Sequence, residues 1–98
     1  MAIQSVNPAT GAVIRQYEEL NAEKIDHALT KAGEAFETWR RSPFWKRAKL
    51  FEEASKRMRQ KSDVYARLMA EEMGKPVTQG AKEIEKCAAL CEYYIQNA

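Results

Sequence analysis

Cys87 and Cys91 are the residues of this chain best suited to chemistry, because a thiolate can attack a carbonyl carbon or bind a soft metal ion. They are four residues apart, which places them on one face of a helix. Zinc would need further ligands, and the single histidine, His27, is distant in the sequence. A nucleophilic cysteine needs a base, and no pattern places His27 beside either thiol. We therefore interpret both cysteines as small buried side chains and His27 as a surface or edge residue.

Acidic pairs and a glycine-lysine motif are the next candidates. Glu71-Glu72 and Glu83/Glu85 could supply an acid or a base, but no second group identifies them as such, and solvated helix charges are the simpler interpretation. Gly74-Lys75-Pro76 lacks the hydroxyl residue that follows the lysine of a phosphate-binding loop. The four glycines, at positions 11, 33, 74 and 80, form no dinucleotide fingerprint. The sequence thus predicts no catalytic, cofactor-binding or metal-binding residue.

Positive charge is concentrated in the middle of the chain. Nine basic and two acidic residues lie between Arg40 and Lys61, a local net charge of +7, whereas the rest of the chain carries −5. The basic residues are Arg40, Arg41, Lys46, Arg47, Lys49, Lys56, Arg57, Arg59 and Lys61. Such a region could bind nucleic acid or another polyanion. We favour a solvated helix face, because no base-reading pattern accompanies the charges.

Length and composition predict one small cytoplasmic domain. Ninety-eight residues, 45% of them apolar and 31% charged, suit a soluble protein. No apolar run approaches the ~20 residues of a membrane helix, so no membrane partner is expected. The N-terminus lacks the basic and apolar regions of a signal peptide, and two cysteines one helical turn apart suit a reducing compartment.

The first twenty residues predict a β-hairpin. Asn7–Gly11 is rich in turn-forming residues, and Ile3, Ser5 and Val6 before it and Val13–Tyr17 after it have the composition of strands. An isolated hairpin is marginal in water, so we expect it to lie against another part of the protein. We assign residues 1–20 to this hairpin and residues 21–98 to a helical segment.

Four helices are predicted after the hairpin. Capping signals mark their starts at Asn21, at Ser42 with Pro43 in the first turn, at Ser62, and at Thr78. Gly74 and Pro76 end the third helix. The fourth helix reaches the last residue without a stop signal, from which we expect that the sequence continues in a longer protein.

Each predicted helix carries an apolar stripe at spacings of three and four. The expected buried positions are Ile25, Ala28, Leu29, Ala32, Phe36 and Trp39; Phe44, Ala48, Phe51, Ala54 and Met58; Tyr65, Leu68, Met69 and Met73; and Ile84, Cys87, Ala88, Cys91, Tyr94 and Ile95. The stripes can cover one another in a small bundle or face a body outside this sequence, and periodicity does not choose between these. The expected fold is mainly α with a short N-terminal hairpin.

The order of several short motifs resembles the N-terminal region of aldehyde dehydrogenases along the whole chain. Asn7–Gly11 with Val13-Ile14 is similar to their N-terminal signature. It is followed by Ala35-Phe36, Trp39, Arg47, Leu50, Glu72–Pro76, Glu83 or Glu85, and Tyr93-Tyr94. The block Glu72–Pro76, with Lys86-Cys87-Ala88 and Tyr93-Tyr94 behind it, looks most like bacterial succinate-semialdehyde dehydrogenases.

The resemblance implies an α/β parent enzyme with a Rossmann-like cofactor domain, a catalytic domain and an oligomerisation strand. Such an enzyme forms a cysteine thiohemiacetal, passes hydride to NAD or NADP, and hydrolyses the thioester with a glutamate base. The resemblance implies that the nucleophilic cysteine, the glutamate base and the cofactor-binding motifs lie beyond position 98. It also implies that Cys87 and Cys91 do not match the family's nucleophilic cysteine. It also implies that the segment packs on the cofactor domain, with Lys86 or Cys87 near the substrate entrance.

We therefore expect an N-terminal fragment of an NAD(P)-dependent aldehyde dehydrogenase, structural and catalytically incompetent alone. Its expected partners are the remainder of the parent enzyme and, through uncovered apolar stripes, further copies of itself. The alternative is a stand-alone helical interaction module that binds a polyanion or a protein through Arg40–Lys61. Salt-dependent binding to nucleic acid would distinguish that alternative.

Overall fold

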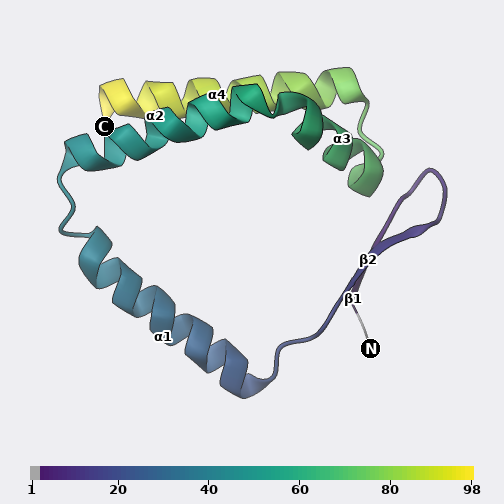
Figure 1. Ribbon diagram of the computed structural model, residues 1–98, viewed down its shortest axis with the longest axis horizontal. Coiled ribbons are helices and arrows are strands. Elements are labelled where there is room, and N and C mark those ends of the chain that lie inside the picture. The colour runs from purple at the N-terminus through teal and green to yellow at the C-terminus, as the bar shows by residue number, and fades with distance from the viewer. Residues whose placement is uncertain (1–2) are drawn as a thin grey trace.

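A computed structural model describes residues 3–98 as a two-stranded antiparallel hairpin followed by four helices (Figure 1). The strands are β1 (Ile3–Val6) and β2 (Val13–Tyr17), and the helices are α1 (Ala22–Trp39), α2 (Phe44–Gln60), α3 (Ser62–Met73) and α4 (Val77–Asn97). This confirms a mainly helical chain with a short N-terminal hairpin. Residues 1 and 2 of the predicted hairpin lie outside the described residues, and the division into two domains stays a prediction.

The hairpin turn is built by the side chain of Asn7. Its Oδ1 accepts hydrogen bonds from the amides of Ala9 and Thr10 at 2.9 and 3.3 Å, as an Asx turn requires. Gly11 adopts φ +75°, a conformation that favours glycine, and donates its N–H to the Asn7 carbonyl at 2.8 Å. The strands pair from Ile3 with Tyr17, and the register shifts after Ser5.

The hairpin lies against the C-terminal end of α3. Ser5 Oγ donates a 2.8 Å hydrogen bond to Glu72, and Pro8 lies against the backbone of Gly74. Gly74 ends α3 with φ +73°, the left-handed conformation of a helix C-cap. The predicted stop at Gly74 is confirmed, and the hairpin has the support that the sequence led us to expect.

The capping residue was predicted correctly only for α1, although α3 does begin at Ser62 as expected. Asn21 caps α1 by accepting the Lys24 N–H at 2.8 Å. Ser42, Ser62 and Thr78 are not caps: Pro43, Lys61 and Pro76 hold those positions, and none makes a side-chain capping bond. At α2 and α4, the proline carbonyl accepts the first helical hydrogen bonds, which a proline can do because its fixed φ suits a helix boundary.

A small core surrounds α4, which packs on α2 and on α3. Its buried members are small, apart from Ile84: Ser55, Ala66, Gly80, Ile84 and Ala88. Gly80 brings the two backbones together, because a Cβ built on it would lie 3.1 Å from the Ala66 Cα. Periodicity missed Ser55, Ala66 and Gly80, and it placed Met73, which is 70% exposed, in the core.

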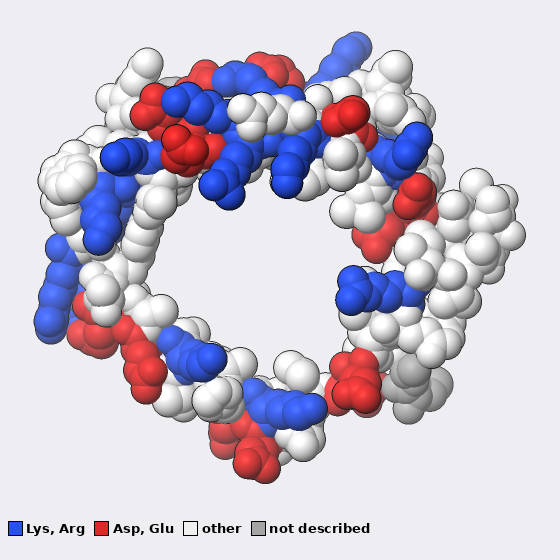
Figure 2. Space-filling model, in the orientation of Figure 1, with Lys and Arg blue, Asp and Glu red and all other residues white. Residues whose placement is uncertain are grey.

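α1 does not pack along any other described element. It stands apart from the α2–α4 pair (Figure 1), and a central opening passes through the molecule (Figure 2). The chain measures 47 × 40 × 17 Å with a radius of gyration of 17.6 Å, against roughly 13 Å for a compact domain of this length. Helices α2, α3 and α4 thus cover one another in part, whereas α1 does not join them.

Gly80→Val is expected to destabilise the helical part by about 1–3 kcal/mol, because valine methyl groups would meet the backbone of α3. Gly33→Val is the matched control: it lies within α1, where an added Cβ meets nothing within 4 Å. Urea unfolding followed by far-UV circular dichroism measures both. Equal unfolding midpoints for the two variants would contradict the close α3–α4 contact.

Candidate docking surface

The structure does not assemble a nucleophilic or metal site around the cysteines. Cys87 is exposed and Cys91 is partly buried on α4, and both thiols are free. His27 is exposed on α1, a helix that does not pack along α4. Among residues 3–98, no three His, Cys, Asp or Glu side chains lie together in a way that could hold a metal ion. The prediction of buried cysteines is wrong for Cys87, which lies on a flank of α4 that nothing covers.

Three of the four carboxylates of the acidic pairs bind neighbouring side chains. Glu83 pairs with Lys75, whose hydrogen bond and charge lower the Glu83 pKa, with a smaller contribution from Lys86. Glu72 accepts from Ser5 and Glu85 accepts from Arg59. The lowered pKa of Glu83 makes this carboxylate a weak base near neutral pH. These contacts join elements of the fold.

The glycines do not form a cofactor-binding loop. Gly74-Lys75-Pro76 joins two helices, whereas a phosphate-binding loop follows a strand. Gly11, Gly33 and Gly80 lie in the hairpin turn, within α1 and within α4. The pyrophosphate of a dinucleotide requires consecutive backbone N–H groups at a glycine-rich strand-to-helix turn. The glycines among residues 3–98 therefore do not form such a pyrophosphate-binding turn.

The basic region between Arg40 and Lys61 is largely engaged in contacts within the chain. Arg40 and Arg41 pair with Glu37, and Lys56 pairs with Glu52. Arg47 and Arg59 donate hydrogen bonds to Trp39 and to glutamates of α4. On the face drawn in Figure 2, basic and acidic side chains alternate over α2 and α4. Five of the nine cations thus have partners, which weakens the polyanion-binding alternative.

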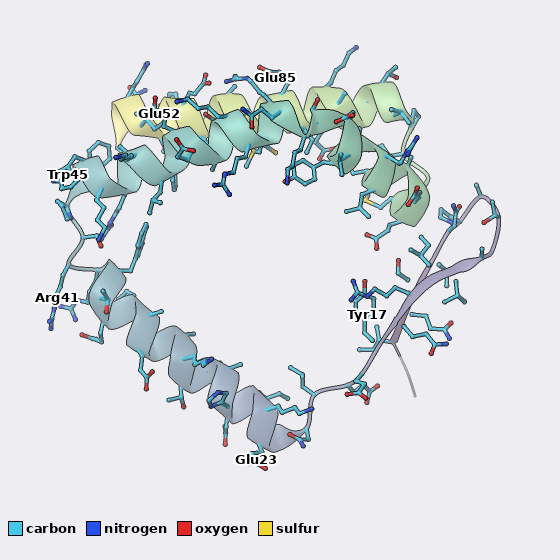
Figure 3. All side chains as sticks on the ribbon, in the orientation of Figure 1. Tyr17, Glu23, Arg41, Trp45, Glu52 and Glu85 are labelled. Carbon is cyan, nitrogen blue, oxygen red and sulfur yellow. The ribbon has the colours of Figure 1, made fainter. Side chains whose placement is uncertain are left out.

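Arg59 joins α2 to α4 through two carboxylates. Its Nη2 and Nε donate to Glu85 at 2.9 and 3.1 Å, and its Nη1 donates to Glu92. Figure 3 labels Glu85 on α4, the helix that packs on α2. The hydrogen bonds that Arg59 donates to Glu92 and to Glu85 raise the Arg59 pKa above its ordinary value, and the bond from Arg59 lowers the Glu92 pKa. Sequence analysis missed this group, although two glutamates seven residues apart on one helix face were a usable signal.

Arg47 fixes the corner between α1 and α2. Its Nη2 donates to the Trp39 carbonyl at 2.8 Å, and its guanidinium lies 5.3 Å from the centre of the Trp39 ring. This is a cation–π geometry. Its Nε is buried and has no hydrogen-bond partner among the described residues. The corner is therefore set by one arginine and one tryptophan.

An apolar groove opens beside this corner. Its volume is about 350 Å³. It is lined by Trp39, Phe44, Arg47, Ala48, Phe51, Tyr94 and Ala98. The four aromatic side chains are each 40–48% exposed. Nothing in the groove combines a nucleophile with a base, so its chemistry is that of a docking surface.

The apolar stripe of α1 is equally uncovered. Ile25, Leu29, Phe36 and Trp39 are 47%, 65%, 58% and 40% exposed, and no residue of α1 is buried. The expectation that these positions are buried is wrong within the described chain. Large contiguous apolar surfaces of this kind mark sites of association. Among residues 3–98, no helix combines the length and the apolar character that crossing a membrane requires.

Comparison with known proteins identifies relatives along the whole chain. The sequence model of the aldehyde dehydrogenase family matches residues 1–98. A probable succinate-semialdehyde dehydrogenase [NADP(+)] of Synechocystis is 35% identical over 98 residues, all of this chain and 22% of that protein. The succinate semialdehyde dehydrogenase [NAD(P)+] Sad of Escherichia coli is 34% identical over 93 residues, 95% of this chain and 20% of that protein. The chain spans about a fifth of the length of these relatives.

Glu92→Gln is expected to lower the thermal midpoint slightly at pH 7, because it removes one carboxylate from Arg59. Since the folded-state pKa of Glu92 is lowered, its contribution is present above the ordinary carboxyl pKa of about 4.3 and is lost as pH falls through the folded value. The difference from the unmodified chain should vanish once the pH lies below the folded-state pKa of Glu92. Glu53→Gln, which removes an α2 carboxylate with no ion pair among the described contacts, is the control and should show no such dependence.

Proposed function

This chain belongs to the aldehyde dehydrogenase family, and on that premise we propose that it is the N-terminal segment of a succinate-semialdehyde dehydrogenase that uses NAD(P)+. The observation that carries the proposal is the similarity over the entire chain to two proteins named for that substrate. In the proposed enzyme, this segment contributes packing surface and supplies no catalytic or cofactor-binding residue.

The geometry of the described residues supports an architectural role. The apolar groove beside Trp39 and the bare stripe of α1 are surfaces without chemistry, and the charged groups are used to hold helices together. We infer that the remaining four-fifths of the enzyme covers part of this apolar surface and carries the α/β cofactor-binding and catalytic parts. Cys87 and Cys91 are free thiols, which suits the reducing cytoplasm.

A chimera tests the architectural role directly. Replacing the matching N-terminal part of the Synechocystis relative by residues 1–98 is expected to preserve reduction of NADP+ by succinate semialdehyde. The same chimera with Gly80→Val should lose most activity, because α3 is displaced from α4, whereas Gly33→Val should retain it. A chimera that folds like the unmodified relative but forms no reduced cofactor would contradict the proposal.

The 98-residue chain alone is expected to be inactive. Purified chain mixed with succinate semialdehyde and either NAD+ or NADP+ should produce no reduced nicotinamide, because no described residue set combines a nucleophile, a base and a cofactor site. The measurement is absorbance of the reduced cofactor over time, with the Synechocystis relative as the positive control. Aldehyde-dependent reduction that disappears in a Cys87→Ser, Cys91→Ser variant would show that the chain is catalytic by itself.

A further inference from the structure

α4 carries two free thiols that the proposed architectural role leaves unused. Cys87 is exposed and Cys91 is partly buried. Neither side chain lines the groove beside Trp39, so the pair is separate from the apolar surface assigned to the rest of the enzyme. Both cysteines lie within one helix, Val77–Asn97, and that helix alone fixes how the two side chains are related.

The helix is held in place on both sides of the thiols. Ile84 and Ala88, which precede the two cysteines by three residues each, are buried. Glu85 and Glu92, which flank the pair in the sequence, bind Arg59 of α2. Side chains four residues apart on a helix lie one above the other, with their Cβ atoms roughly 5–6 Å apart. The two thiols therefore share one face of a fixed helix.

This separation disfavours a disulfide between Cys87 and Cys91. A disulfide requires Cβ atoms roughly 3.5–4.5 Å apart, which is closer than side chains at this spacing on a helix lie. Closing the bond would distort α4 where Ile84 and Ala88 are buried. An atom inserted between the two sulfurs lengthens the bridge and removes the need for that distortion. The geometry thus favours a one-atom bridge over oxidation.

The bridging atom must be satisfied by two sulfur ligands. Zinc is unsuitable because it takes four ligands, and among residues 3–98 no third His, Cys, Asp or Glu side chain joins the pair. Trivalent arsenic differs, because it bonds to two thiol sulfurs and keeps its third substituent. It is a soft electrophile, and thiolates are soft donors. Arsenic in this oxidation state therefore matches both the number and the chemistry of the available ligands.

We propose that Cys87 and Cys91 form a dithiol site for trivalent arsenic compounds that carry two exchangeable hydroxyl groups. Each sulfur bonds to arsenic as a thiolate, so two arsenic–sulfur bonds form and two arsenic–oxygen bonds break. Each hydroxyl leaves as water with the proton of one thiol. Arsenic stays trivalent, and no electron is transferred. The site is built by α4 alone and does not rest on the proposed function.

The exposed thiol of Cys87 is the point of entry to the site. Once its sulfur has bonded to arsenic, the bond to Cys91 is intramolecular and benefits from a high effective concentration. The nearest carboxylate one turn before Cys87 belongs to Glu83, which is bound to Lys75. Arsenous compounds are uncharged at neutral pH, so charge does not oppose their approach.

Phenylarsonous acid tests the site in the reduced 98-residue chain. Intact-mass spectrometry is expected to show one phenylarsenic group per chain, and thiol titration should show that both free thiols are lost. Cys87→Ser and Cys91→Ser should each weaken binding at least ~100-fold, because a single sulfur lacks the intramolecular second bond. Unchanged affinity in either variant, with helix content preserved in far-UV circular dichroism, would overturn the proposal.

A matched control moves one thiol to the opposite side of α4. Cys91→Ser combined with Ala89→Cys keeps two thiols in the helix, and Ala89 is exposed, so no buried group is disturbed. The thiols are then two residues apart, where side chains do not face each other. This variant should bind phenylarsonous acid as weakly as the single-thiol variants. Equally tight one-to-one binding by the control would overturn the assignment to the Cys87–Cys91 face.

The effect on the helix provides an independent measurement. A bridge between Cys87 and Cys91 connects successive turns of α4, so binding is expected to raise the thermal midpoint followed by far-UV circular dichroism. Excess 1,2-dithiol should remove the arsenic and restore the original midpoint. Loss of helix content on binding would show that the thiols meet only when α4 unwinds, which would contradict a site formed by the folded helix.

Discussion

The close approach of α3 to α4 at Gly80 and Ala66 is the contact on which the rest of the structure depends. A glycine within a helix is unfavourable by up to about 1 kcal/mol relative to alanine, so Gly80 in the first turn of α4 needs a packing reason. Here the reason is that the Gly80 backbone lies against the Ala66 backbone. Once α3 is fixed on α4, the hairpin follows, because Ser5 and Pro8 rest on the C-terminal end of α3.

The other side of α4 holds α2 by different means. Ser55, Ile84 and Ala88 provide little apolar area, so Arg59 and its two glutamates provide much of the registration between these helices. Such exposed ion pairs contribute little free energy individually. An arginine bound to two carboxylates nevertheless defines how far α2 is shifted and rotated relative to α4. The helical part is thus positioned by small residues and charges more than by a large core.

The parts of the fold that were predictable from sequence are those decided by local chemistry. Asn7 and Gly11 dictate the hairpin turn, Asn21 the first helix start, and Gly74 a helix end. The predicted caps at Ser42 and Thr78 were wrong because Pro43 and Pro76 hold the N-cap positions of α2 and α4. The predicted cap at Ser62 was wrong because α2 and α3 are joined by the single residue Lys61, which holds that position. Burial of Ser55, Ala66 and Gly80 depends on how helices cross, which apolar periodicity does not encode.

The sequence predicts no combination of catalytic residues in this chain, and the structure leaves apolar faces exposed. Both observations follow from residues that serve packing. The resemblance seen in the sequence rests on motifs such as Glu72–Pro76 and Asn7–Gly11. The structure uses these as a helix stop, a hairpin turn and the contact between them. Arg47, another motif residue, orients Trp39 at the edge of the groove. The residues that carry the resemblance therefore shape the surface on which another polypeptide can pack, and this is why similarity along the whole chain identifies a family without identifying an active site.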